Sequence, residues 1–347
     1  MKQSSFALAA MLSIGIASCA GGGQTPYTGA GPDFQRAVTT EAAAASDAEQ
    51  LFVASADPFF VDDFALPVGD SSMPAHVLQN VNEPVPLAVD AHHLFVGSLD
   101  DSVIYRYDLP ISGGAAPQTI SLGGLRTASS HGAFRPPLSG LGDAKPVLDI
   151  GDPTGIAVGN GFLYVAGVGN NFKEQVQAYA TPVTSGAMPA ATIQYDAIDF
   201  LAVATSGNAL YVASTTEGTI RAFATPLHSG QTPLFTINIR PQQDAAIGIT
   251  VSSKIYVADY SFGEVLVFDR PYHSGETPVR LNMKIANGGL NPAPFAVAVD
   301  RQHLFVSASN GVYQYDLPIT SNEMPSAIVP MTNGTPTGVA VWPKWPQ

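Results

Sequence analysis

The sequence predicts an all-β fold in which six four-stranded antiparallel units form the blades of a six-bladed β-propeller. Three observations predict it. One unit recurs six times after residue 50. Glycine and proline are abundant, with 33 and 28 residues, which favours strands joined by turns over helices. The last copy is followed by one extra strand that the first copy lacks, so a C-terminal strand is expected to pair into the first blade and close the ring.

Three markers identify each unit, and they follow one another in the same order. A pair of prolines stands seven residues apart: Pro67/Pro74, Pro110/Pro117, Pro182/Pro189, Pro226/Pro233, Pro271/Pro278 and Pro318/Pro325. An aromatic residue stands three positions before each first proline: Phe64, Tyr107, Tyr179, Phe223, Phe268 and Tyr315. An aliphatic–aromatic–valine triplet lies upstream, beginning at Leu51, Leu94, Leu163, Leu210, Ile255 and Leu304. Such repetition at a fixed spacing indicates one structural unit used six times.

Each unit is predicted to contain four short strands. The first is built from small and apolar residues, as in Gly155–Val158, which suits a strand buried on both faces. The triplet forms the second strand, and the third ends at the aromatic residue. The proline-flanked loop then ends the ladder because proline has no N–H to donate. A shorter fourth strand follows, such as Leu234–Ile237.

The spacing and the two ends of the repeat predict a closed ring. Successive first prolines lie 43, 72, 44, 45 and 47 residues apart, and the long interval contains an insertion at residues 123–149. The first copy begins at its second strand, at Leu51, whereas Pro336–Trp342 follows the last copy as an unpaired first strand. Joining the two leaves no open sheet edge. An open solenoid would need capped ends, and a seventh blade would need a further marker set within the insertion, which has none.

Composition excludes several classes of protein. Hydrophobic residues make up 46% of the 347, which excludes global disorder. The net charge of −13 argues against binding to nucleic acid, whose phosphates it would repel. Cys19 is the only cysteine, so neither an intramolecular disulfide nor a multi-cysteine metal site is expected.

The N-terminus is predicted to contain a secretion signal. Lys2 precedes the apolar run Phe6–Ala17, which is too short to span a bilayer as a helix. The run ends in Ile16-Ala17-Ser18-Cys19, which resembles the bacterial lipoprotein signal, where the cysteine is lipidated and becomes the new N-terminus. An ordinary cleaved signal with an incidental cysteine is the alternative.

The resemblance implies a domain plan and a location. Residues 1–18 would be the signal peptide, 19–50 a flexible tether and 51–347 the propeller. The chain would be lipid-anchored at Cys19 in the cell envelope, with its bulk outside the cytoplasm. Because residue 20 is alanine and not aspartate, the resemblance favours the outer over the inner membrane in a Gram-negative cell.

The repeat itself resembles the NHL and YVTN class of propeller repeat over most of residues 51–342. The resemblance rests on Ile255-Tyr256-Val257-Ala258-Asp259 followed by Val265-Leu266-Val267-Phe268-Asp269, although most copies lack the usual Asp-x-x-Gly-Asn turn. Relatives of this kind include gluconolactonase-like enzymes, lyases and binding scaffolds. The resemblance therefore implies the fold and leaves the function open.

Candidate site residues are sought where the innermost strands begin, because ligands meet the central channel there. Alignment of these strands on their final valine predicts one level containing Val85, Thr154, Asp199, Ile247, Phe295 and Thr337, with Asp199 its lone charge. The 123–149 insertion is expected to reach the same face and contains Arg126, His131 and Arg135. In an acidic chain these basic groups favour a small polar or anionic ligand. Asp199, Arg126, His131 and Arg135 are therefore the ligand-binding candidates.

No catalytic residue is identified, since the chain has no GxSxG, HExxH, Walker or EF-hand motif. His92 and His93 lie in an inner hairpin turn, where His303 matches His93, and solvated turn residues are favoured over metal ligands. We expect a membrane-anchored extracytoplasmic scaffold that binds a small ligand or an envelope protein without a cofactor or metal. The alternatives are a gluconolactonase-like or lyase-type enzyme with an axial divalent metal, and a structural part of an envelope assembly.

Replacing Cys19 tests the anchor. Cys19→Ser should release the protein from the membrane fraction, because the acylated thioether can no longer form. Membrane fractionation and mass spectrometry of the N-terminus check this, and a variant that stays acylated and membrane-bound would refute the lipoprotein interpretation.

Overall fold

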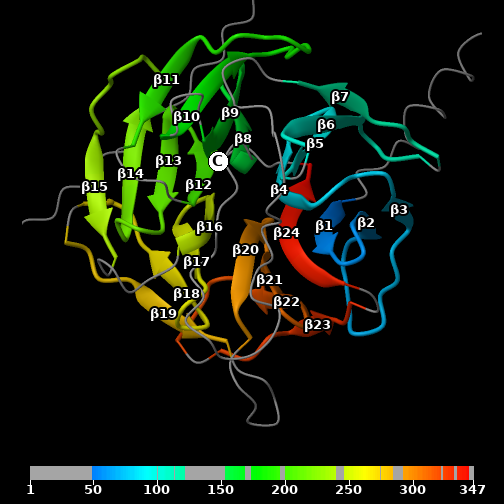
Figure 1. Cartoon of the computed structure of the whole chain (residues 1–347). Helices are drawn as coiled ribbons and strands as arrows, with labels where there is room; N and C mark the ends of the chain where they lie inside the picture. Colours follow the sequence, from blue (N-terminus) through cyan, green and yellow to red (C-terminus); the bar gives the residue numbers. More distant parts are fainter. Residues whose placement is uncertain are drawn as a thin grey trace, which may run out of the picture. The chain divides into compact units, whose positions relative to one another are not determined.

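The computed structural model divides the chain into two units, Met1–Ser46 and Asp47–Gln347. It describes residues 49–99, 101–112, 114–121, 153–168, 173–195, 200–239, 246–273, 275–283, 292–321, 323–331 and 334–343, which all belong to the second unit. These residues form twenty-four strands in six four-stranded antiparallel sheets arranged as a six-bladed β-propeller, as the sequence predicts (Figure 1). Over these ranges the search for a helix long and apolar enough to cross a membrane finds none.

The strands of each blade follow from the innermost to the outermost. Blade 1 contains β24 (Thr335–Trp342), β1 (Gln50–Ala56), β2 (Phe60–Ala65) and β3 (His76–Leu78). Blade 2 contains β4 (Pro84–Val89), β5 (His93–Ser98), β6 (Val103–Asp108) and β7 (Gln118–Ile120). Blade 3 contains β8 (Pro153–Gly159), β9 (Phe162–Val168), β10 (Glu174–Ala180) and β11 (Ala191–Gln194).

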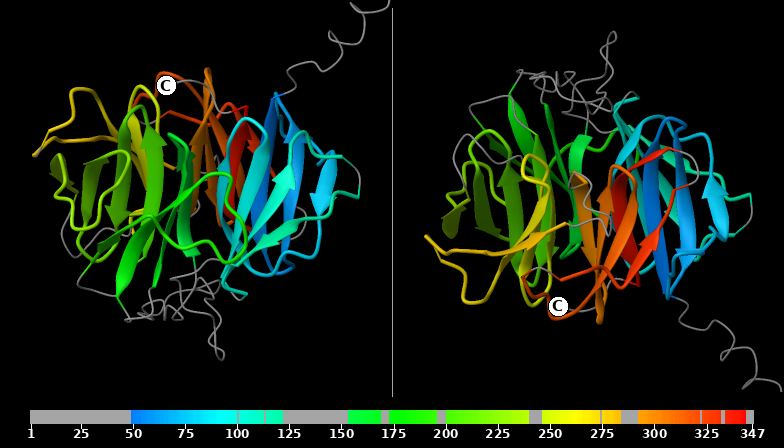
Figure 2. Two further views of the ribbon diagram at one scale, coloured as in Figure 1. Left: turned by 90° about the horizontal axis from the view of Figure 1, so that it is seen from above. Right: turned by 90° about the horizontal axis from the view of Figure 1, so that it is seen from below.

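The second half of the ring has the same plan. Blade 4 contains β12 (Leu201–Ser206), β13 (Ala209–Ser214), β14 (Thr219–Ala224) and β15 (Phe235–Asn238). Blade 5 contains β16 (Ala246–Val251), β17 (Ile255–Asp259), β18 (Glu264–Phe268) and β19 (Val279–Asn282). Blade 6 contains β20 (Pro294–Val299), β21 (His303–Ala308), β22 (Gly311–Asp316) and β23 (Ala327–Val329). Figure 2 shows the blades from two further sides.

The C-terminal strand closes the ring, which confirms the sequence prediction. β24 pairs antiparallel with β1, with Val339 opposite Val53 and Trp342 opposite Gln50. The indole Nε1 of Trp342 also donates to the carbonyl of Ala91 in blade 2, at 3.2 Å. The last strand of the chain therefore joins the first blade to its neighbour as well as completing it.

The recurring triplet packs neighbouring blades together. Side chains alternate between the two faces of a strand, so the first and third residues of a triplet face one neighbour and the aromatic residue faces the other. Leu210 and Val212 pack in the cluster shared with blade 3, whereas Tyr211 packs in the cluster shared with blade 5. The same division holds in all six blades and gives six hydrophobic clusters, one between each pair of neighbours.

The proline-flanked loop is a second contact between blades. The peptide bond before its first proline is cis in all six copies. The next residue, such as Val183, packs on the preceding blade. In the loops of blades 1, 3 and 4, the side chain two positions later accepts an N–H from the outer edge of that blade. Ser185 Oγ accepts from Ser121 N at 3.3 Å, and Asp70 Oδ1 accepts from Ile328 N at 2.8 Å. These contacts cover exposed strand edges.

Glycines allow the innermost strands of alternate blades to approach their neighbours closely. A Cβ on Gly155 of β8 would lie 2.6 Å from the carbonyl oxygen of Leu201 in blade 4. A Cβ on Gly248 of β16 would lie 2.7 Å from the Phe295 carbonyl oxygen in blade 6, and one on Gly338 would overlap the Val85 carbonyl oxygen in blade 2. The inner ring is therefore too tight for a side chain at these three positions.

Alanine at these glycines is expected to destabilise the ring. Gly155→Ala and Gly338→Ala should each lower the free energy of unfolding by at least about 1–3 kcal/mol, because the added methyl group overlaps a neighbouring backbone. Gly69→Ala is the matched control, since nothing lies within 4 Å of its Cβ position, and should change stability by less than about 0.5 kcal/mol. Urea unfolding of the full chain measures the difference, and equal stability of all three variants would contradict the close approach.

Candidate functional site

Six aliphatic residues form a girdle around the central channel. Each comes from the same position of an innermost strand, and each strand pairs that position with the valine of the triplet. The girdle consists of Leu87, Ile156, Val203, Ile249, Val297 and Val339. All six residues line two cavities, one on each side of the girdle. The girdle is therefore the level at which two candidate sites meet.

The upper cavity lies on the side where the innermost strands begin, and its volume is about 270 Å³. Three aromatic side chains line it, from Phe200, Tyr260 and Phe295. Tyr260 belongs to the turn between β17 and β18, and its ring packs against Phe295 of the next blade with 5.4 Å between the centroids. Burial raises the pKa of the Tyr260 hydroxyl, so this group is protonated at neutral pH.

The threonine hydroxyls of the upper cavity are bonded to backbone carbonyls. Thr215 Oγ1 donates to the Phe200 carbonyl at 2.7 Å. Thr337 Oγ1 lies 2.8 Å from the Pro84 carbonyl of blade 2, and Thr154 Oγ1 lies 3.1 Å from the Leu201 carbonyl of blade 4. These hydroxyls join structural elements and are thus occupied. The wall that a ligand would meet is mainly apolar. This differs from the sequence-based expectation of a polar or anionic ligand.

The register of blade 4 corrects one part of the sequence alignment. β12 pairs Val203 with Val212, so its final valine belongs to the girdle and not to the level of Val158. Thr205 stands at the position of β12 that corresponds to Val158 of β8. Its hydroxyl donates to the Val158 carbonyl at 2.8 Å. The level assigned to Asp199 is consequently occupied by Leu201, two residues later. Threonine has the branched shape of valine, which is why alignment on valine fails here.

The lower cavity lies on the side where the innermost strands end, and its volume is about 560 Å³. Its wall contains charged groups, namely Arg270, Asp300 and Arg301. Arg270 follows β18 and extends its guanidinium toward blade 4, where Nη2 lies 3.3 Å from Ser206 Oγ. The same nitrogen donates to the Ser252 carbonyl at 3.1 Å. The two mouths of the channel therefore differ in polarity.

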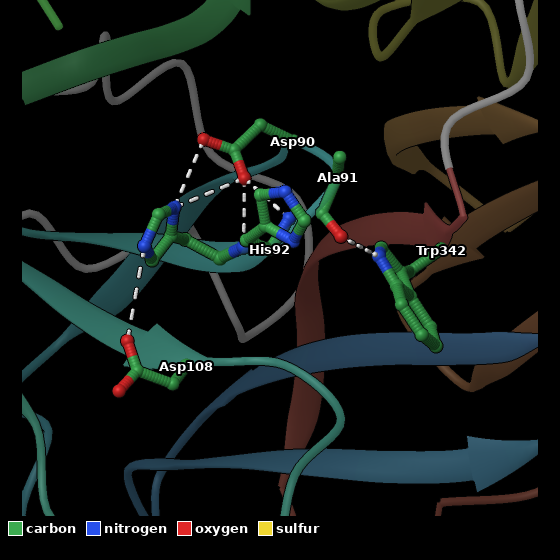
Figure 3. A network of polar contacts seen from close by, with 6 residues as sticks. Asp90, Ala91, His92, Asp108 and Trp342 are labelled. Atoms are coloured by element: carbon green, nitrogen blue, oxygen red, sulfur yellow. Dashed lines mark hydrogen bonds and ion pairs between the residues drawn. The ribbon is translucent and has the colours of Figure 1, made fainter. Parts of the chain in front are cut away.

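Aspartates hold the inner hairpin turns on the lower side. Oδ1 of Asp90 accepts the backbone N–H groups of His92 and His93, both at 2.7 Å. The His93 ring lies between two carboxylates: Asp90 is 3.1 Å from its Nδ1 and Asp108 is 3.8 Å from its Nε2. Figure 3 labels both aspartates. His303 repeats the arrangement between Asp300 and Asp316, at 2.9 and 3.9 Å. The match between His93 and His303 is confirmed, and both rings have structural partners.

The predicted site residues lie outside the part of the chain that the structure describes. This holds for Cys19, Arg126, His131, Arg135 and Asp199, which therefore remain predictions. Among the residues that are described, no three His, Cys, Asp or Glu side chains gather closely enough to hold a metal ion. The axial metal of the enzyme alternative accordingly remains an untested hypothesis.

Sequence reasoning missed Arg270 and Tyr260. Arg270 precedes the first proline of its blade, where the other five copies have leucine or threonine. That departure from the repeat was the available signal. Tyr260 follows its strand in a turn of no fixed sequence, and nothing in the repeat indicates that this turn reaches the channel.

Comparison with known proteins establishes the fold alone. No protein-family model matches the chain, and no curated protein matches it in sequence. A chain in the crystal structure of a nidogen/laminin complex is 14% identical, with a TM-score of 0.53, over 84% of this chain and 98% of its own length. A protein of unknown function from Bacteroides caccae is 9% identical, with a TM-score of 0.54, over 85% and 98%. These likenesses support the six-bladed propeller.

Two buried carboxyl groups lie away from the channel, in β2. Asp63 Oδ2 accepts from Gln50 Nε2 and contacts His76 Nδ1, both at 2.9 Å. Asp62 lies on the opposite face of the strand, on the same side as Phe64, which packs in the cluster shared with blade 6. Burial raises the pKa of Asp62 from 3.8 to about 6. Its ionised form is therefore disfavoured in the folded state.

Asp62→Asn should stabilise the protein more at pH 7 than at pH 4. The folded state holds the Asp62 proton more tightly than the unfolded chain, so wild-type stability is lost as the pH rises from about 4 to 6. Asparagine does not titrate, and its stability relative to wild type should increase by about 2–3 kcal/mol over that interval. Urea unfolding at both pH values measures this, with Asp57→Asn in an exposed turn as the control. A pH-independent difference for Asp62→Asn would show that its carboxyl is not perturbed.

Proposed function

We propose that this protein is a binding protein whose ligand is a small molecule with an apolar body, held in the upper cavity of the channel. The observation that carries the proposal is the composition of the wall. Phe200, Tyr260 and Phe295 form an aromatic surface above the aliphatic girdle, while the threonine hydroxyls are bonded to carbonyls. A concave apolar site with few available polar groups favours ligands of this class.

Tyr260 supplies a polar group to this site. No other described residue forms a hydrogen bond with its hydroxyl, and the raised pKa keeps the proton in place. The phenol is thus available to donate to an oxygen or nitrogen of the ligand. Its packing against Phe295 orients the ring, so the donor has a defined position before the ligand arrives.

The ligand predicted from the insertion can be combined with this wall. A ligand with an apolar body and an acidic end would place the body in the upper cavity and the end beyond its rim. Arg126, His131 and Arg135 would then meet the acidic end if the insertion covers this mouth, as its place between β7 and β8 suggests. That part of the proposal rests on the sequence.

We also propose that the propeller is held at a membrane of the cell envelope by a lipid on Cys19. The proposal rests on the apolar run and the Ile16–Cys19 box. β1 begins at Gln50, so a tether of about 30 residues would lie between the lipid and the first blade. A scaffold attached in this way would bind its ligand close to the membrane surface without inserting into it.

Filling one cavity at a time tests the binding site. The neutral probe N-phenyl-1-naphthylamine should bind the wild-type chain with a saturable rise in fluorescence. Ile247→Trp fills the upper cavity and should raise its dissociation constant at least tenfold, about 1.4 kcal/mol. Thr250→Trp, three residues along the same strand, fills the lower cavity and is the matched control. The assignment of the probe to the upper cavity would be contradicted if both variants weakened binding equally, or if neither variant weakened it.

A further inference from the structure

We infer that the lower cavity is a second and separate binding site, that it takes a small organic anion, and that Arg270 pairs with the charged group. The inference does not depend on occupation of the upper cavity, because the aliphatic girdle lies between the two. It rests on how Arg270 is held, on the charges around it, and on the surfaces that line the cavity.

Arg270 is held in position by neutral oxygen atoms from two blades. Its Nη2 donates to Ser206 Oγ of blade 4 and to the Ser252 carbonyl of blade 5. Its Nε lies 3.3 Å from the hydroxyl of Tyr272, and its guanidinium lies 5.5 Å from the centre of that ring. A guanidinium fixed by several contacts loses little entropy when it binds a ligand.

Tyr272 is itself fixed by aromatic neighbours. Its ring lies 6.0 Å from Tyr211 and 6.2 Å from Phe235, between centroids. Its hydroxyl can donate to the Ser253 carbonyl, 3.4 Å away, while it accepts from Arg270. The support for the guanidinium thus reaches from the cavity wall into the interface between blades 4 and 5.

The charge of Arg270 is not neutralised within the described part of the chain. Each of its hydrogen bonds there goes to a neutral oxygen, and no carboxylate pairs with it. The Arg270 side chain is exposed, so a ligand can reach its guanidinium from solvent. A guanidinium with free donors at a cavity wall is suited to bind a carboxylate, sulfonate or phosphate group.

The other charged groups of the cavity are compatible with an anion. The Asp300 carboxylate is buried, and its Oδ1 accepts the backbone N–H groups of Gln302 and His303, each at 2.6 Å. Its Oδ2 contacts His303 Nδ1 at 2.9 Å, so the acid is satisfied by the turn that it holds. Arg301 adds a second positive charge to the wall.

The remaining wall selects for an anion with an apolar part. The girdle forms the floor of the lower cavity, and Val158, Val251 and Val299 continue the aliphatic surface toward the mouth. An inorganic ion would satisfy Arg270 and leave this surface exposed to water. An organic anion can satisfy both, because its apolar part covers the aliphatic wall while its charge meets the guanidinium.

A charged relative of the neutral probe tests the inference. The fluorescent anion 8-anilinonaphthalene-1-sulfonate should bind the full chain, and Arg270→Gln should raise its dissociation constant at least tenfold. Arg270→Lys should recover part of the loss, because it restores the charge without the planar fork. Arg280→Gln is the matched control for net charge. It removes an arginine that is paired with Glu264 and lies in β19, the outermost strand of blade 5.

The cavity variants separate this site from the upper one. Thr250→Trp should abolish tight binding of the anion, whereas Ile247→Trp should leave it intact. Unchanged affinity in Arg270→Gln would overturn the inference, and so would an equal loss in Arg280→Gln, which would indicate general charge attraction. Loss of anion binding in Ile247→Trp alone would place the probe in the upper cavity and overturn it as well. Binding of the neutral probe should not change in Arg270→Gln, which shows that this variant is folded.

Discussion

The pairing of β24 with β1 is the contact on which the rest of the structure depends. It brings together strands from the two ends of the repeat region and gives every blade two neighbours. Side chains of β24 complete two of the six hydrophobic clusters, with Ala340 packed toward blade 2 and Val339 and Val341 toward blade 6. Without this strand, two clusters would lose buried apolar surface and the edge of β1 would be exposed. The channel exists because the ring is closed.

In the closed ring, each blade packs against its two neighbours with its faces and lines the channel with its innermost strand. The faces that meet neighbouring blades are apolar and tightly packed, and they leave little room for variation. Residues of the innermost strands that line the channel make fewer contacts between blades, so they can differ from blade to blade. Glycine in blades 1, 3 and 5 lets the backbone of the next blade approach, and the next blade has proline or alanine at the same position. The walls of the channel are accordingly irregular although the blades repeat.

The two cavities show what this freedom allows. Above the girdle the wall is aromatic and its hydroxyls are occupied, whereas below it a guanidinium is held by two serines and a tyrosine. Neither arrangement affects the hydrophobic clusters between the blades. A scaffold of this kind can present different chemistry at its two mouths while it keeps one folding plan.

The sequence alone determined the blade count and the closing strand of this protein. Cross-strand pairs such as Leu51 opposite Phe64 recur because every blade must bury the same face against its neighbour. Such constraints are local and repeat with the unit, so they can be recognised in one chain.

Only the tertiary structure decided the level of each residue in the channel and the chemistry of the two cavities. A two-residue shift in β12 moved the level assigned to Asp199 onto Leu201, because Thr205 occupies a place where valine was expected. Arg270 lies beside Ser206 only because blades 4 and 5 pack together. Contacts between blades join residues that are distant in the sequence. The repeat pattern determines which faces meet without determining which side chains converge at the axis.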